Sequence, residues 1–202
     1  MQIAVIGSGN VGATLGSRWA AAGHEVLFGA RDPHSPKAVA ALAKAGDNAR
    51  IVDIPSAIAA STVVVIAVPG RAVPEFAAEH GSALAGKLVI DATNQFDQPV
   101  INGLPALRAV APTATFIRAF NSQGWETFAD PIFAGVQADL FYCAPEGEAR
   151  EVAEQLIADI GFRPILAGDL SRIALVDNLG ALWVNLAFAQ QRGRRVTLKL
   201  LG

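Results

Sequence analysis

The first 31 residues of the chain contain an apolar run, a glycine-rich turn, a helix-like stretch and a second apolar run. The turn is Gly7-Ser8-Gly9-Asn10-Val11-Gly12, and it directly follows the apolar residues 3–6. This arrangement is typical of a dinucleotide-binding βαβ unit, because each glycine has a steric role. The first permits a tight turn, the second lets a pyrophosphate approach the backbone, and the third lets the helix pack on the strand. The free N–H groups and the dipole at the helix N-terminus favour the charge of a pyrophosphate.

The end of the second apolar run predicts which dinucleotide is bound. An NAD-binding chain usually has Asp or Glu there, about 20 residues beyond the glycines, to bind the ribose 2′-hydroxyl. This chain has Ala30 followed by Arg31. A guanidinium forms charge-assisted hydrogen bonds with a 2′-phosphate, and Lys37 offers a second positive charge. We therefore expect NADP(H); the alternative is that Arg31 is only a solvated residue at the strand end.

Strand-like and helix-like segments alternate along most of the chain. Such alternation predicts an α/β fold of the Rossmann type, doubly wound, with a mainly parallel sheet and a small C-terminal helical lobe. We expect an NADP-binding domain over residues 1–167, and a small helix and strand over residues 168–202 in the same compact unit. The strands are expected at residues 3–6, 25–29, 50–53, 62–68, 88–91, 115–120, 138–143 and 164–166.

The last segment is predicted to contain a helix from about residue 172 to 191, with Asp169 or Ser171 as its cap. Its apolar residues surround most of its circumference, which predicts burial or a membrane span. Asp177, Asn178 and Asn185 lie within it and argue against a span. We expect this helix to form a subunit interface, giving a homodimer, or a wall of the active site. An alternating strand is expected over residues 196–200.

Composition excludes several classes of function. With 52% hydrophobic and 17% charged residues the chain is expected to be globular. A formal net charge of −2 does not favour binding to nucleic acid or to anionic membranes. The single cysteine, Cys143, fits a reducing cytoplasm and lies in an apolar strand pattern, so we expect a buried, inert thiol. Because the first strand starts directly after Met1, we expect no signal or transit peptide.

Ligands of doubly wound sheets bind beyond the carboxyl ends of the strands. Two segments at such positions are candidates for the nicotinamide side of the cofactor, and Thr93 and Asn94 are as well explained as residues that cap a turn. The candidate residues are Ala67, Val68 and Pro69 after the central strand, and Ala92, Thr93 and Asn94 after the next one.

The chain lacks the usual patterns of acid–base, nucleophilic and metal catalysis. None of His24, His34 and His80 lies in a strand-end loop, and we expect each at the surface. We find no H-E-x-x-H motif, no paired cysteines, no ligand-spaced carboxylate cluster and no G-x-S-x-G motif. We therefore expect no metal and assign no catalytic side chain. The protein would then contribute positioning and electrostatics to cofactor chemistry.

Several of these motifs together resemble a known family, the NADP-dependent oxidoreductases that reduce the deazaflavin coenzyme F420. The resemblance covers nearly the whole chain. The matching segments are GSGNVG (residues 7–12), GAR (29–31), GDLS (168–171), LVDNL (175–179) and LKLL (198–201). The AFNS run at residues 119–122 is also similar to the cytosolic NADPH–flavin domain of membrane ferric reductases.

The resemblance implies a dimeric reductase in which hydride passes between stacked rings. It assigns the pyrophosphate to Ser8, Asn10 and Val11, and it makes Asn121 and Trp125 candidates for binding the acceptor. Family members have histidine where this chain has Asn121, so the acceptor stays open between a deazaflavin, a flavin and a similar redox ring. Trp125 is equally well explained as an aromatic residue packed in the lobe. Two other functions also remain, a non-catalytic NADP(H)-binding sensor or partner module, and a reductase of a small carbonyl or imine.

Overall fold

The computed structural model describes residues 1–201. The chain forms two compact units, unit 1 over Met1–Phe116 and unit 2 from Ile117 onward. This division lies within strand β6 (Thr115–Arg118), whereas the sequence places a boundary after residue 167. The C-terminal lobe expected from residue 168 onward lies within unit 2. That this lobe forms one compact unit with residues 1–167 stays a prediction.

Unit 1 contains a parallel sheet in the order β5-β4-β1-β2-β3. Every residue of β4 is buried, as its continuous β-branched run predicts for a strand covered on both faces. Because β1 lies between β2 and β4, the strand order reverses beside it, as in the predicted doubly wound fold. The strands are β1 (Gln2–Ile6), β2 (Glu25–Ala30), β3 (Ala49–Asp53), β4 (Val63–Ile66) and β5 (Leu88–Asp91).

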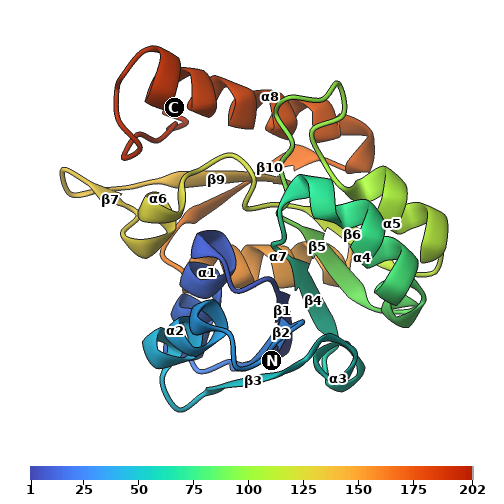
Figure 1. Ribbon diagram of the computed structural model, residues 1–202. Coiled ribbons are helices and arrows are strands. Elements are labelled where there is room, and N and C mark those ends of the chain that lie inside the picture. Colours follow the sequence, from blue (N-terminus) through green and yellow to red (C-terminus); the bar gives the residue numbers. More distant parts are fainter. Residues whose placement is uncertain (202) are drawn as a thin grey trace. The chain divides into compact units, whose positions relative to one another are not determined.

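Helices cover both faces of this sheet (Figure 1). On one face α1 packs with α2, whereas α3 contacts β1 and β2 together with η2, and α4 packs with α5. Two of the helices have side-chain N-caps. Ser35 accepts a hydrogen bond from a backbone N–H group of α2, and Asp53 accepts one from α3. The sequence pattern does not predict α5. The helices are α1 (Asn10–Ala21), α2 (Pro36–Ala45), α3 (Ile54–Ala60), α4 (Val73–His80) and α5 (Leu104–Val110), with 3₁₀ turns η1 (Gly70–Ala72) and η2 (Gly81–Leu84).

In unit 2, β9 (Asp139–Cys143) pairs with both β6 and β10 (Arg163–Gly168). The β9–β10 pair is parallel and α7 (Glu148–Asp159) connects it, whereas β6 and β9 are antiparallel. The expectation of a mainly parallel α/β fold is therefore confirmed. A short helix and a two-stranded hairpin precede β9, and the sequence pattern does not predict them. They are α6 (Trp125–Ala129), β7 (Ile132–Phe133) and β8 (Val136–Gln137).

The C-terminal part of unit 2 is a helical stretch followed by an irregular segment. It consists of η3 (Leu170–Arg172), α8 (Ile173–Val184) and the π-helix η4 (Asn185–Ala189). Asp169 caps its start, because its Oδ1 accepts a hydrogen bond from Ser171 N–H at 2.8 Å. The strand expected over residues 196–200 is wrong. Side chains of Trp183 and Asp139 bind the backbone of this segment in place of a strand ladder.

The stretch Leu170–Ala189 is long and apolar enough to cross a membrane by length and composition alone, with a mean hydropathy of 1.2 and 28% of its window buried. This is a weak indication, because a helix packed in a protein core has a similar composition. Asp177 in this stretch is buried and forms an ion pair with Arg118 of β6. The residue that argues most strongly against a span therefore has a partner within unit 2.

Two single-residue expectations have different outcomes. Cys143 is fully buried, as predicted, and burial together with the negative charges of Asp177 and Asp169 raises the pKa of its thiol to about 11. His24 is not the surface residue expected, since it is buried and its Nδ1 lies 3.1 Å from the amino group of Met1. His24 lies directly before β2, and its ring contacts the N-terminus of the chain.

Candidate functional site

Strands β1, β4 and β5 of unit 1 end at the same level, so the residues that follow them lie together at one edge of the sheet. Ala67 N–H donates to Ile6 O at 2.8 Å, and Ala92 N–H donates to Ile66 O at 3.0 Å. Gly7 follows β1 at the same level, where a Cβ atom would lie 2.7 Å from Ala67 O. Its φ of +110° is also rarely adopted by L side chains, so glycine is required there. The structure thus places the glycine turn beside the residues expected near the nicotinamide.

The N-terminus of α1 begins within this turn. A Cβ atom on Gly12 would lie 1.9 Å from Gly7 O, so the third glycine lets the helix start directly against the turn. Gly9 is the N-cap, with extended backbone, no side-chain cap and no acidic residue in the following turn. A Cβ atom on Gly9 would meet nothing within 4 Å. The glycine is therefore unnecessary for packing within the protein, and its open side fits the approach of a ligand to the helix N-terminus.

Arg31 follows β2 at the same edge of the sheet and is exposed. Its Nη1 lies 3.9 Å from Glu75 Oε2, on the first turn of α4. Surface pairs at this distance contribute little, so the guanidinium can turn to an anionic ligand without a large energetic cost. Lys37 is exposed on the first turn of α2. The sequence pattern does not point to Glu75, because a pair so distant in the chain leaves no local signal.

The segment after β5 is fixed by a buried carboxylate. Asp91 Oδ1 accepts hydrogen bonds from Thr93 N–H at 2.9 Å and from Thr93 Oγ1 at 2.6 Å, and Asp91 Oδ2 accepts one from Gly103 N–H at 2.8 Å. The Thr93 hydroxyl therefore donates within the turn, as the turn-capping interpretation predicts. Asn94 lies against η1, since a Cβ atom on Gly70 would be 2.6 Å from Asn94 O. Roles of Ala92, Thr93 and Asn94 in binding a cofactor stay predictions.

The candidate acceptor loop, residues 121–125, lies in unit 2 and follows β6. Asn121 is buried, and its Nδ2 donates to Val176 O at 3.1 Å and to Asp177 Oδ1 at 3.3 Å. The same carboxylate accepts hydrogen bonds from Arg118 Nε and Nη2, at 2.8 and 2.7 Å. Phe120, which lies between the end of β6 and Asn121, has a φ of +60°. This is a left-handed backbone conformation that residues other than glycine seldom adopt. The start of the loop is thus held against α8.

The rest of this loop combines buried polar atoms with a half-buried tryptophan. Ser122 Oγ and Gln123 Oε1 are buried and lack hydrogen-bond partners among residues 1–201. Trp125 is the first residue of α6 and is partly exposed, which leaves both the stacking and the packing interpretation in place. Gly124 lies against Trp183, where a Cβ atom would approach to 2.6 Å.

The described part of the chain contains no group of three or more His, Cys, Asp or Glu side chains that could hold a metal ion. At the edge of the unit 1 sheet the conspicuous features are backbone N–H groups, a cation at the end of β2 and the proline after β4. Pro69 has no N–H and a fixed φ, so it shapes a surface and does not donate. Such a set can bind and orient a phosphorylated ligand, but it supplies no evident proton donor.

Comparison with known proteins agrees with this geometry. The family model described as NADP oxidoreductase, coenzyme F420-dependent, matches residues 2–95, which include β1 to β5. The F420-dependent NADP reductase of Methanothermobacter thermautotrophicus is 32% identical over 211 aligned positions, covering 92% of this chain and 89% of the relative.

Two further similarities extend along the chain. A solved structure, described as a candidate F420-dependent NADP-reductase from Arthrobacter sp. FB24, is 25% identical, with 100% of both chains covered and a TM-score of 0.85. Metalloreductase STEAP3 of Rattus norvegicus is 25% identical over 84% of this chain, which spans 34% of that protein. On the identity and coverage of the methanogen enzyme together with the matching fold, this chain belongs to the family of F420-dependent NADP oxidoreductases.

Proposed function

We propose that the protein transfers hydride between NADP(H) and coenzyme F420. The observation that carries the proposal is the open side of Gly9 at an uncapped helix N-terminus, in a chain whose family contains named F420-dependent NADP reductases. Arg31, in place of the usual acidic residue after β2, supports the phosphorylated form of the dinucleotide.

The residues of unit 1 fit this cofactor. Ser8, Asn10 and Val11, with the glycines of the turn, would hold the pyrophosphate at the start of α1. Arg31 would bind the 2′-phosphate, with Lys37 as a second cation. The nicotinamide side would lie along Ala67, Val68 and Pro69 and the segment Ala92, Thr93 and Asn94, which the register of β4 and β5 places at one edge.

NADPH supplies the hydride when it is bound. The protein then has to orient the donor and acceptor rings and exclude water between them. Two features of unit 1 serve this purpose: Pro69 gives a rigid apolar surface, and Asp91 fixes the segment after β5 through hydrogen bonds from Thr93 and Gly103. We assign no acid–base step to a side chain.

Trp125 is the proposed contact with the acceptor, and Asn121 is proposed to shape the loop that carries it. Trp125 is partly exposed, as an aromatic ring that stacks on a planar ligand has to be. The side-chain nitrogen of Asn121 donates to Val176 O and Asp177 Oδ1 of α8, so Asn121 would act mainly by shaping the loop. F420 is favoured over a flavin because two reductases that are 32% and 30% identical over 92% of this chain are named for it.

We also propose that the protein is a cytoplasmic homodimer. Leu175 and Leu182 of α8, seven residues apart and therefore on one helix face, are 53% and 44% exposed, and Phe188 of η4 is 51% exposed. A second copy of the chain would cover this apolar surface. Light scattering at micromolar concentration tests this point, and a strictly monomeric mass would contradict it.

Steady-state assays with NADPH and a panel of acceptors test the function. F420, FMN, FAD and ferric chelates should be compared at equal concentration, with NADH as the alternative donor. We expect NADPH-dependent turnover with F420 and much slower turnover with the others. Turnover with FMN or a ferric chelate alone would move the function toward flavin chemistry, and no turnover with any acceptor would overturn the proposal.

A further inference from the structure

The irregular C-terminal segment of unit 2, residues 194–200, runs along the candidate acceptor loop and the elements that follow it. We call it the C-terminal strap. Five of its residues contact residues between positions 123 and 139, and Trp183 and Arg163 donate hydrogen bonds to its backbone carbonyls. The contacts join Arg194 to Glu126, Arg195 to Asp130, Thr197 to Gln123, and Lys199 and Leu200 to Asp139.

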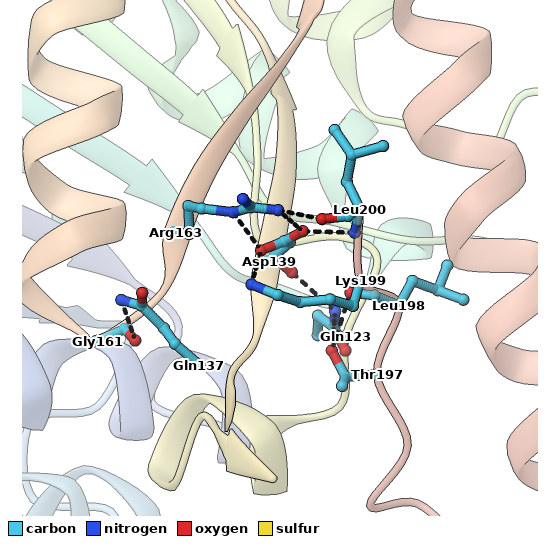
Figure 2. A network of polar contacts seen from close by, with 9 residues as sticks. All are labelled: Gln123, Gln137, Asp139, Gly161, Arg163, Thr197, Leu198, Lys199 and Leu200. Carbon is cyan, nitrogen blue, oxygen red and sulfur yellow. Dashed lines mark hydrogen bonds and ion pairs between the residues drawn. The ribbon is translucent and has the colours of Figure 1, made fainter. Parts of the chain in front are cut away.

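The end of the strap is anchored on a buried carboxylate (Figure 2). Asp139 is fully buried and accepts a hydrogen bond from Lys199 Nζ at 2.8 Å and one from Leu200 N–H at 2.7 Å. Arg163 of β10 binds both oxygens of the same carboxylate and also donates to Leu200 O. A buried carboxylate without partners would destabilise the fold, and these contacts supply its partners. They also connect the strap to β9 and β10.

The beginning of the strap is held by its two arginines. Arg194 binds both oxygens of Glu126, with Nη2 to Oε2 at 3.1 Å, and its guanidinium lies 5.7 Å from the centre of the Trp183 ring. Arg195 binds Asp130 and lies 4.9 Å from the Phe133 ring. The basic cluster at residues 192–195 thus has partners within unit 2 for two of its cations.

The middle of the strap contacts the loop itself. Gln123 Nε2 donates to Thr197 Oγ1 at 3.0 Å and to Asp139 O at 3.2 Å, as Figure 2 shows. Gln123 is 7% exposed and lies between Asn121 and Trp125 in the sequence. A single side chain therefore connects the loop to both the strap and β9.

We infer that the C-terminal strap positions the acceptor-binding loop, with Gln123 and Thr197 as positioning residues. The inference rests on the proposed function, since it takes residues 121–125 as the loop that binds the F420 ring. Stacking a planar ring requires a fixed aromatic surface, and Trp125 is two residues from the hydrogen bond to the strap. Losing that bond would loosen the loop without altering the nucleotide-binding turn.

Thr197→Val tests the inference, because valine keeps the shape of threonine and removes the hydroxyl. Thr197→Ser restores a hydroxyl, and Thr113→Val makes the same substitution at an exposed turn before β6. The readouts are the KM for F420, kcat, the Kd for NADPH and hydrogen exchange of the backbone amides of residues 121–129.

We expect Thr197→Val to raise the KM for F420 by roughly three- to tenfold, the size of one intramolecular hydrogen bond, and to speed exchange in the loop. The Kd for NADPH should stay unchanged. Thr197→Ser should restore most of the affinity, and Thr113→Val should behave as the wild type. A loss that appears equally in NADPH binding would indicate general destabilisation and overturn the inference.

The two proposals fail in different ways. If the wild type reduces F420 and Thr197→Val has an unchanged KM, the strap has no positioning role and the proposed function stands. If the wild type turns over no acceptor, the proposed function fails. Hydrogen exchange still decides in that case whether the strap holds the loop: unchanged exchange in Thr197→Val overturns the inference, and faster exchange supports it.

Discussion

Arg163 and Asp139 form a two-point ion pair, with Nε to Oδ1 at 2.8 Å and Nη2 to Oδ2 at 2.7 Å. Asp139 is fully buried, and burial alone would raise the pKa of its carboxyl group. Hydrogen bonds from Arg163, Lys199 and Leu200 N–H outweigh that effect and lower the pKa from 3.8 to about 2. The charged form is therefore part of the folded structure of unit 2.

The stability of the protein should fall in acid for this reason. A carboxyl group whose folded pKa is depressed stabilises the folded state above its unfolded pKa, and the contribution is lost as the pH falls through the folded pKa. With the pKa at about 2 and an ordinary value of 3.8, we expect a loss of about 2 kcal/mol in the free energy of unfolding between about pH 4 and pH 2. Urea unfolding at a series of pH values measures it. Asp139→Asn should be less stable at pH 7 and show a flatter profile in that window, and a profile parallel to the wild type would contradict this assignment.

Arg31→Ala should weaken NADPH binding by about 1.5–3 kcal/mol, because charge-assisted hydrogen bonds to the 2′-phosphate are lost. NADH binding should change much less, since NADH has no such phosphate. The free energy of unfolding should change by less than about 0.5 kcal/mol, because the Arg31 side chain is 77% exposed and its contact with Glu75 is long. Fluorescence titration with both nucleotides measures the difference. Equal weakening for NADPH and NADH would refute the phosphate role.

The second and third glycines of the turn should respond differently to alanine. In Gly12→Ala the new Cβ atom would lie 1.9 Å from Gly7 O, so the turn and α1 must shift, and we expect loss of both stability and NADPH binding. In Gly9→Ala the Cβ atom meets nothing within 4 Å, so the thermal midpoint should stay within a few degrees of the wild type. NADPH affinity should nevertheless fall at least tenfold, because the methyl group occupies the approach of the pyrophosphate. Unchanged affinity in Gly9→Ala would place the ligand elsewhere.

Much of unit 1 can be predicted from the sequence because its signals are local. The turn at residues 7–12 fixes β1 and α1, and the β-branched run in β4 is fully buried as its pattern indicates. The strand order then places the residues after β4 and β5 beside the turn, since parallel strands end at one edge. The proposed cofactor half of the site follows from these few segments.

Unit 2 is harder to predict because distant residues hold it together. Residues 196–200 alternate like a strand, yet Trp183, Asp139 and Gln123 bind them individually. His24 looks like a surface residue in the sequence, but it is buried against the N-terminus. No local pattern predicts that residues more than 50 positions apart, such as Gln123 and Thr197, will pair.

Calorimetric titration of the wild-type protein with NADPH and then with NADH tests the central claim most directly. The glycine turn and Arg31 predict saturable binding of NADPH with one nucleotide per chain, at least tenfold tighter than NADH. The absence of heat with NADPH, or equal affinity for the two nucleotides, would contradict the claim that this edge of unit 1 binds a phosphorylated dinucleotide.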